Sequence, residues 1–271
     1  MTKVFPFICN GENGHAPRRL TVRLAENAED LSAVQHLRWR VFHEEMGAQG
    51  KSILPSQLDC DDYDQLCDHL LVMDESAEGA DKAVGTYRLL RESVARKNGG
   101  FYSASEFNIG LLERGPARPQ GELLELGRSC VLPQFRTSAT IQLLWRGIAD
   151  YIARYNIGLM FGCASFAGTD PNSHAEALSL LYHRHLAPEN LRTTVREGHG
   201  QPLERLAFGT YDERRALLAL PPLVKGYLRA GACFGDGVYI DHDFNTVDVS
   251  VILPVEQISR RYSARFTVAA A

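Results

Sequence analysis

The sequence lacks the patterns that identify several common classes of site. Its six cysteines include no CxxC pair, and their spacing fits neither a structural zinc site nor a disulfide framework. No HxxxH or HExxH spacing occurs, which argues against a zinc site built on a helix. A GxSxG elbow is absent as well, which disfavours an α/β-hydrolase. We therefore expect neither a metal nor a redox cofactor.

The chain also has no excess of positive charge and no long apolar run. A formal net charge of −4 argues against a protein that binds nucleic acid through bulk basicity. No stretch approaches the roughly 18 uninterrupted apolar residues of a membrane-spanning helix, and the first residues do not form a secretory signal. We expect a cytoplasmic protein with no nucleic-acid partner.

Hydrophobic periodicity predicts a mixed α/β fold in a single domain. At 271 residues the chain is long enough to bury one large core. We expect a poorly ordered lead-in over 1–19 and one domain over 20–271, with an insertion around 91–121 and a C-terminal extension. Strands are predicted over 20–24, 69–73, 83–90, 159–166 and 247–253, and helices over 28–46, over 174–185 and after the Pro221-Pro222 pair.

The segment from Glu122 to Leu144 carries the strongest functional signal. An apolar strand bearing Glu125 and Arg128 runs into a turn and then into an amphipathic helix, with Ile141 expected on its buried face. The first N–H groups of a helix have no internal partner, so such a junction can hold an anion. The alternative is an ordinary buried strand with an incidental ion pair.

Glu125 and Arg128 are three residues apart, so a regular strand would point them to opposite faces. Gly127 lies between them, and glycine within a strand often marks a bulge. A bulge here would turn both side chains to one side and leave backbone amides available to a ligand.

A second group of charged residues precedes the strand over 69–73. The run LDCDDYDQLCDH does not fit a calcium loop, because a loop counted from Asp59 needs glycine at 64 and glutamate at 70, where the chain has Asp64 and Leu70. Asp61 and Asp64 are candidates for binding a cationic substrate. A solvated acidic loop is the alternative.

Two arginines are candidates for binding an anionic group. Arg38 and Phe42 share a face of the first predicted helix, and Arg88 lies on the strand over 83–90. A guanidinium can grip a carboxylate or phosphate with two parallel hydrogen bonds. Packing or an internal salt bridge is the alternative role for both.

These segments, in this order, resemble the ornithine N-acyltransferases that start bacterial ornithine-lipid synthesis and, more distantly, the acyl-homoserine-lactone synthases. The resemblance spans roughly residues 20–265 and rests on LRWRVFHEEMGA, DCDDYDQLCDHLLV, VGTYRLL, ELGRSCVLPQFRTSATIQLLWRGIADYI and LPPLVKGYLRAGA, among others. It implies a GNAT acyltransferase-like fold, with a central mixed sheet whose middle strands splay apart. It also implies that one set of residues binds the amine and assists its attack on a thioester: Arg38, Phe42, Asp61, Asp64, Arg88, Glu125 and Arg128.

The start of the motif helix favours an acyl carrier protein as the acyl donor. Many CoA-dependent relatives have glycines there, whereas this chain has Ala139 and Ile141, whose side chains should crowd a pyrophosphate. A carrier protein presents a phosphopantetheine arm with a single phosphodiester. We expect the thioester to contact Cys130, Val131, Leu132, Arg136, Thr137, Ser138 and Ala139. Cys130 as an acylated nucleophile is the less favoured alternative.

The expected reaction is transfer of a 3-hydroxyacyl group from acyl carrier protein to the α-amine of L-ornithine, with Glu125 as general base. No cofactor is expected beyond the thioester co-substrate, and peripheral membrane contact is expected because the product is a lipid. Three alternatives remain: a CoA-dependent N-acyltransferase acting on another amine, a lactone synthase that uses S-adenosylmethionine, and a non-catalytic scaffold that binds acyl carrier protein.

Overall fold

The computed structural model describes residues 5–9, 18–49, 57–77 and 79–258, and we discuss only these. They fall into two compact units. Unit 1 comprises Met1–Leu90, Leu126–Tyr155 and Ser263–Ala271, and unit 2 comprises Arg91–Glu125 and Asn156–Tyr262. The chain passes from unit 2 back to unit 1 within one strand, between Glu125 and Leu126. The prediction of a single domain stays a prediction.

Unit 1 is built on an antiparallel run of strands. The order is β1 (Phe5–Cys9), β2 (Arg18–Leu24), β3 (Asp68–Asp74) and β4 (Ala83–Arg91). The end of β6 (Glu122–Val131) lies beside β4, where Leu132 N donates to Val84 O at 3.0 Å. β3 and β4 are buried along nearly their whole length, which explains why their sequences are continuous apolar runs.

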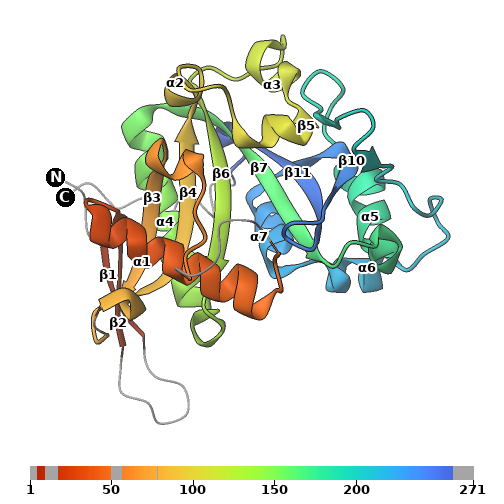
Figure 1. Cartoon of the computed structure of the whole chain (residues 1–271). Coiled ribbons are helices and arrows are strands. Elements are labelled where there is room, and N and C mark those ends of the chain that lie inside the picture. The colour runs from red at the N-terminus through yellow and green to blue at the C-terminus, as the bar shows by residue number, and fades with distance from the viewer. Residues whose placement is uncertain (1–4, 10–17, 50–56, 78, 259–271) are drawn as a thin grey trace. The chain divides into compact units, whose positions relative to one another are not determined.

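Two long helices cover the opposite faces of these strands. Figure 1 shows α1 (Ala28–Trp39) in front of the strands and α4 (Ser138–Tyr155) behind them. α1 begins at the side chain of Asn27, which accepts from Asp30 N, and continues as a π-helical segment over Arg40–Glu45. Gly147 of α4 lies so close to β2 and β3 that a Cβ there would meet Leu70 at 2.6 Å.

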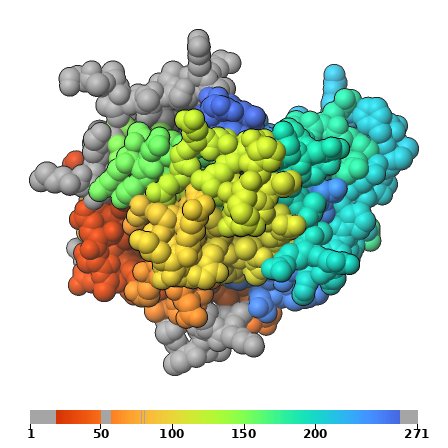
Figure 2. All heavy atoms as spheres, turned by 90° about the horizontal axis from the view of Figure 1, so that it is seen from above, coloured from red at the N-terminus to blue at the C-terminus, as the bar shows by residue number. Residues whose placement is uncertain are grey.

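Unit 2 contains a mixed sheet in the order β7 (Ile157–Ala167), β11 (Thr246–Pro254), β10 (Cys233–Asp241), β8 (Thr194–Val195) and β5 (Phe107–Asn108). β9 (Gly200–Gln201) pairs with β10. Its helices are α2 (Glu92–Ala95), α3 (Gly110–Arg114), α5 (Ala175–His185), α6 (Glu213–Ala219) and α7 (Pro222–Ala230). In Figure 2 the insertion over 91–121, coloured yellow to yellow-green, lies on the face seen from above.

The predicted mixed α/β class is confirmed, and the predicted strands and helices are present within a few residues of their expected bounds. Within the predicted lead-in over 1–19, residues 5–9 form β1, whose backbone pairs with β2. The lead-in as a whole stays a prediction. β10 and α6 were not predicted. Ile141 is 40% exposed rather than buried, because its neighbour Thr140 occupies the inward position against Gly85. The splaying of the central strands stays a prediction.

Candidate active site

Six charged residues of unit 1 form one connected network. Arg38 comes from α1, Arg88 from β4 and Arg128 from β6, and the loop before β3 supplies Asp59, Asp61 and Asp64. The loop holds its shape because Asp61 caps a 3-10 turn over Asp62–Gln65, accepting from Tyr63 N at 3.0 Å. The structure therefore brings together five of the charged residues predicted from sequence and adds Asp59 to them.

Arg38 lies at the centre of this network and has no solvent exposure. Its Nε donates to Asp59 Oδ2 at 2.7 Å, and its Nη1 and Nη2 donate to the two carboxylate oxygens of Asp64 at 2.8 and 2.7 Å. A further bond reaches the backbone carbonyl of Asp59. All of the guanidinium's edges are thus engaged, which corrects the expectation that Arg38 binds a substrate carboxylate.

Asp64 is equally enclosed. Besides Arg38 it accepts from Gln35 Nε2 at 2.9 Å and from Arg88 Nη1 at 3.0 Å. Burial by itself would raise the pKa of Asp64, but the hydrogen bond and charge of Arg38 outweigh burial and hold that pKa well below its usual range. Asp64 is therefore an ionised partner of two arginines, which corrects its expected role as a binder of a cationic substrate.

Asp59 is ionised for a similar reason. Burial raises its pKa, but a hydrogen bond from His43 and the charges of Arg38 and Arg128 lower that pKa to about 2. His43 Nε2 lies 3.5 Å from Asp59 Oδ1. Phe42, the predicted aromatic partner of Arg38, precedes His43 in the π-helical segment and is half-buried.

Arg128 and Asp61 form the more open part of the network. Arg128 Nη2 donates to Asp61 Oδ2 at 3.0 Å, and Arg88 Nη1 donates to the other oxygen of Asp61 at 2.6 Å. The side chain of Asp61 is 25% exposed and that of Arg128 is 13% exposed, against 4% for Arg88. A substrate that approaches this network meets Asp61 and Arg128 first.

The backbone at Arg128 is unusual. Its φ is +48°, in a region that residues other than glycine adopt rarely and at a cost of about 1–3 kcal/mol. The irregularity predicted at Gly127 is therefore present one residue later. The ion pairs with Asp61 and Asp59 hold Arg128 in this conformation.

Glu125, the predicted general base, belongs to unit 2 and is held by three donors. Its carboxylate accepts from Tyr102 N at 2.8 Å, from Ser103 N at 2.7 Å and from the Ser103 hydroxyl. All three donors come from a 3-10 turn over Tyr102–Ser105 in the insertion. These three bonds fix the orientation of the Glu125 carboxylate.

The predicted donor-binding segment is only partly open. Leu132 N is bonded to Val84 O, and the carbonyl of Val131 accepts from Arg136 Nε at 3.0 Å. Those two backbone groups are therefore engaged within the protein, and the expected contact of the thioester with this segment stays a prediction. Arg136 also forms a two-bond salt bridge with Glu45, with both distances 2.6 Å.

The first turn of α4 is the accessible part of that segment. Thr137 and Ser138 are exposed and Ala139 is half-buried. Thr137 accepts from Thr140 N through its hydroxyl at 3.4 Å and from Ile141 N through its carbonyl at 3.2 Å, as a residue that begins a helix does. The helix N-terminus thus faces solvent, as the binding of a phosphate group requires.

Cys130 does not suit a nucleophilic role. It is buried at the end of β6, and burial raises the pKa of its thiol to about 12. Because the thiolate is the nucleophilic form, this environment disfavours the alternative of an acylated cysteine.

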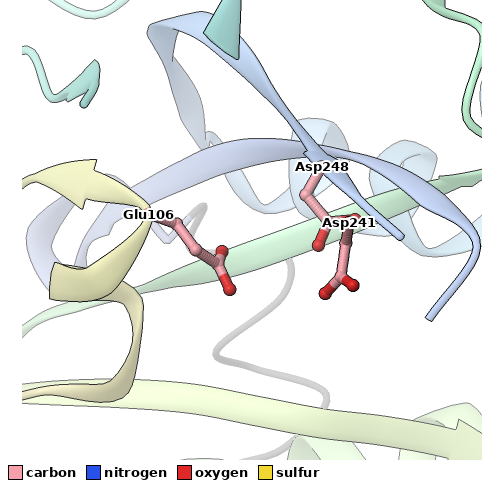
Figure 3. Close-up of side chains that lie close together, drawn as sticks. All are labelled: Glu106, Asp241 and Asp248. Atoms are coloured by element: carbon pink, nitrogen blue, oxygen red, sulfur yellow. The ribbon is translucent and has the colours of Figure 1, made fainter. Parts of the chain in front are cut away.

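One cluster of unit 2 was not predicted from the sequence. Glu106, Asp241 and Asp248 each bring a carboxylate oxygen within 4.8 Å of the others, and Figure 3 shows the three groups turned toward a common space. Burial and the charge of Asp248 raise the pKa of Glu106 to about 8. The signal in the sequence was the alternation of β11, which puts Asp248 between two valines. Alternation of this kind suggests that the polar face of a strand is solvated, whereas β11 is buried on both faces.

None of the helices in the described part of the chain combines the length and apolarity that a bilayer crossing requires.

Comparison with known proteins identifies relatives over nearly the whole chain. Residues 37–146 match the family described as "Acetyltransferase (GNAT) domain". The L-ornithine N(alpha)-acyltransferase of Agrobacterium fabrum (strain C58 / ATCC 33970) is 47% identical over 251 residues, which is 90% of this chain and 83% of that protein. The protein of the same name from Rhizobium meliloti (strain 1021) is 46% identical over 250 residues, which is 90% of this chain and 82% of that protein.

Among solved structures, the crystal structure of the AHL synthase LasI matches with a TM-score of 0.50 at 15% sequence identity. The match covers 91% of this chain and 94% of the LasI chain. At this identity the likeness concerns the fold alone. Together with the GNAT match, it confirms the acyltransferase-like fold class predicted from the sequence.

The network around Arg38 predicts a large loss of stability on its removal. Arg38→Leu should lower the free energy of unfolding by about 3–5 kcal/mol, because Asp59 and Asp64 stay buried and lose the arginine that bonds to both of them. The matched control is Arg40→Leu, two residues along, whose 3.0 Å pair with Asp81 is solvent-exposed and should cost within about 1 kcal/mol. Urea denaturation of both variants measures the difference. Equal losses would contradict a central role for Arg38.

The raised pKa of Glu106 predicts a specific pH dependence. Asp248, Asp241, Glu125 and the thiol of Cys163 face this group. Between about pH 4.5, the ordinary value, and about pH 8, the folded state holds a proton that the unfolded chain has lost, so stability falls as pH rises. The slope for one proton is about 1.4 kcal/mol per pH unit.

Glu106→Gln should therefore flatten the decline of unfolding free energy between pH 5 and 8. The control is Glu197→Gln, at an exposed position of unit 2. Urea denaturation at a series of pH values tests this, and an unchanged slope in Glu106→Gln would show that another group causes the decline.

Proposed function

The chain belongs to the L-ornithine N(alpha)-acyltransferase family, and we propose that it transfers a 3-hydroxyacyl group from acyl carrier protein to the α-amine of L-ornithine. The observation that carries the proposal is the 40–47% identity to four proteins of this name over 90–93% of the chain. The thioester C–S bond breaks and an amide C–N bond forms. The carrier's thiol leaves with a proton, and the product is N-acyl-ornithine.

Glu125 is proposed to accept the proton that the α-ammonium must lose before it can attack. Its hydrogen bonds to Tyr102 and Ser103 fix the orientation of the carboxylate. The proton passes to it directly or through a water. General-base assistance of this kind contributes typically 10²–10⁴-fold in rate.

Arg128 is the proposed partner of the ornithine carboxylate. Sequence considerations left Arg38 and Arg88 as candidates, but both are buried and bonded to Asp64. Arg128 is the most exposed arginine of the network, and its position is fixed by Asp61. Asp61 and Arg128 form an ion pair with no net charge, which suits a substrate that carries both an ammonium and a carboxylate.

The phosphodiester of an acyl carrier protein arm is proposed to bind at the start of α4. The exposed first turn at Thr137 and Ser138 offers unpaired helix N–H groups to an anion. Ile141 is exposed one turn into the helix, so its branched side chain is available to obstruct a bulkier pyrophosphate. This supports acyl carrier protein over CoA as the donor.

Peripheral membrane contact is proposed because N-acyl-ornithine is an amphiphile that must reach a bilayer. Among the described residues, the most exposed large apolar side chains are Leu218 and Phe208, at 76% and 58%. Leu218 lies on α6, which also carries Arg214 and Arg215. Apolar side chains beside basic ones suit the surface of an anionic membrane.

The reaction is tested by mass spectrometry of the purified protein with 3-hydroxypalmitoyl carrier protein and ornithine, lysine and glycine in competition. We expect N-acyl-ornithine, and a loss of about 10²–10⁴-fold in kcat for Glu125→Gln. The control is Glu122→Gln on the same strand, whose carboxylate bonds to Ser93. Glu122→Gln should retain activity within a few-fold.

Other outcomes of this assay identify the alternatives. Product with another amine and acyl-CoA indicates a different N-acyltransferase. Binding of the acyl carrier protein without turnover, unaffected by Glu125→Gln, indicates a scaffold.

Donor choice is tested separately with Ala139→Gly/Ile141→Gly. Removing these side chains should raise kcat/KM for acyl-CoA by about tenfold while acyl carrier protein gains nothing, because only the pyrophosphate needs the added space. Glycine in a helix costs roughly 1 kcal/mol per residue, so folding is checked by thermal melting. The control is Gln142→Gly, at an exposed position of the same helix turn. If both donors respond equally, the side chains at 139 and 141 do not select between them.

A further inference from the structure

The carboxylates of Glu106, Asp241 and Asp248 form a compact negative cluster in unit 2. Their nearest oxygens lie within 4.8 Å of one another, and Figure 3 shows Glu106 facing the two aspartates. Glu106 precedes β5, Asp241 ends β10 and Asp248 lies on β11. Glu106 and Asp248 are buried, and Asp241 is partly exposed, so the cluster opens to solvent on the Asp241 side.

A fourth polar side chain on the same sheet face has no bonding partner. In the antiparallel register Asp241 lies opposite Thr246, and Asp248 is two residues farther along the same strand, so all three side chains share one face. The hydroxyl of Thr246 is buried at 2% exposure, and within the described residues nothing hydrogen-bonds to its Oγ1. A buried hydroxyl left unbonded is costly, which points to a ligand that fills this space.

The strongest charges acting on Glu106 are of one sign. The thiol of Cys163 donates to Glu106 Oε2 at 3.1 Å, and the strongest charges acting on Glu106 are those of Asp248, Asp241 and Glu125. In the part of the chain that the structure describes, no lysine or arginine forms a salt bridge with Glu106 or Asp241. This contrasts with unit 1, where three arginines balance three aspartates.

We propose that Glu106, Asp241 and Asp248 bind the side-chain ammonium of the amino-acid acceptor, which under the proposed function is L-ornithine. The sequence had suggested Asp61 and Asp64 for this role, but arginines already neutralise both. In the cluster of unit 2, Asp241 and Asp248 offer negative charge to the ammonium and Glu106 offers a further acceptor oxygen. Binding there distinguishes ornithine from amino acids with an uncharged side chain.

The spacing of the cluster suits an ammonium group. Three hydrogen bonds of about 2.8 Å, donated along tetrahedral directions, place their acceptors about 4.6 Å apart. That separation lies within the 4.8 Å limit of the cluster. A hard metal ion with oxygens at about 2.1–2.4 Å draws neighbouring ligands to roughly 3–3.4 Å. The 4.8 Å limit allows that separation too, so the test below includes metal binding as an outcome.

The test compares L-ornithine with L-norvaline, which has the same carbon chain without the terminal amine. Wild type and Asp241→Asn are measured for kcat/KM with each amino acid and 3-hydroxypalmitoyl carrier protein, and for binding of each amino acid by calorimetry. Asparagine keeps an acceptor for Phe244 N, which Asp241 Oδ1 bonds at 2.8 Å, so the turn is preserved. Glu106→Gln serves as a second variant.

We expect Asp241→Asn to lower the ornithine-to-norvaline ratio of kcat/KM by about 10–100-fold, since a hydrogen bond to a charged group is worth roughly 1.5–3 kcal/mol. Calorimetric affinity for ornithine should fall by a similar factor. The matched control is Asp243→Asn, which removes the same charge at an exposed position two residues away and should leave the ratio unchanged.

Three results overturn the inference: an unchanged ratio in Asp241→Asn and Glu106→Gln, no binding of ornithine by wild type, or stoichiometric Mn²⁺ or Ca²⁺ binding that Asp241→Asn abolishes. The same measurements test the proposed function separately from the binding site. If wild type binds ornithine through the cluster but acylates no amine, the binding site stands and the reaction does not. If ornithine is acylated with a ratio insensitive to both variants, the reaction stands and the site does not.

Discussion

The buried guanidinium of Arg38 is the interaction on which unit 1 depends. It joins α1 to the loop that carries Asp59 and Asp64, and through those aspartates it reaches Arg88 on β4 and Arg128 on β6. Enclosing so many charges is costly unless each is paired, and here the three arginines and three aspartates balance. The network therefore fixes the position of Arg128, including its unusual backbone, more than it supplies ligands for a substrate.

That balance separates two kinds of acidic residue that look alike in the sequence. The aspartates before β3 are held as ions by arginines, whereas Glu106 in unit 2 sits among other carboxylates and has a raised pKa. Charge that is neutralised within the fold contributes to stability. Glu106 instead keeps its proton up to about pH 8, because burial and the charge of Asp248 disfavour its ionised form.

Much of the fold could be predicted because it follows from hydrophobic periodicity. β3, β4 and β7 are apolar runs, and α4 has Leu144 and Ile148 at helical spacing. β10 was missed because its register shifts between Phe234 and Val238, and the glycines in that bulge interrupt the strand pattern. The residues of the site could be named from the sequence, but their pairing could not. Which oxygen of Asp64 meets Arg38 or Arg88 depends on how a loop, a helix and a strand pack together.

The thiols of this protein have a chemical consequence for an enzyme that handles thioesters. Burial raises the pKa of Cys130 to about 12 and of Cys233 to about 11, and it raises the pKa of Cys163 well above its ordinary value. With a pKa near 12, only about one Cys130 in 10⁵ is ionised at pH 7. An activated acyl group passing these residues meets sulfur in its unreactive form. Under the proposed function, these three thiols therefore compete poorly with the amine for the acyl group.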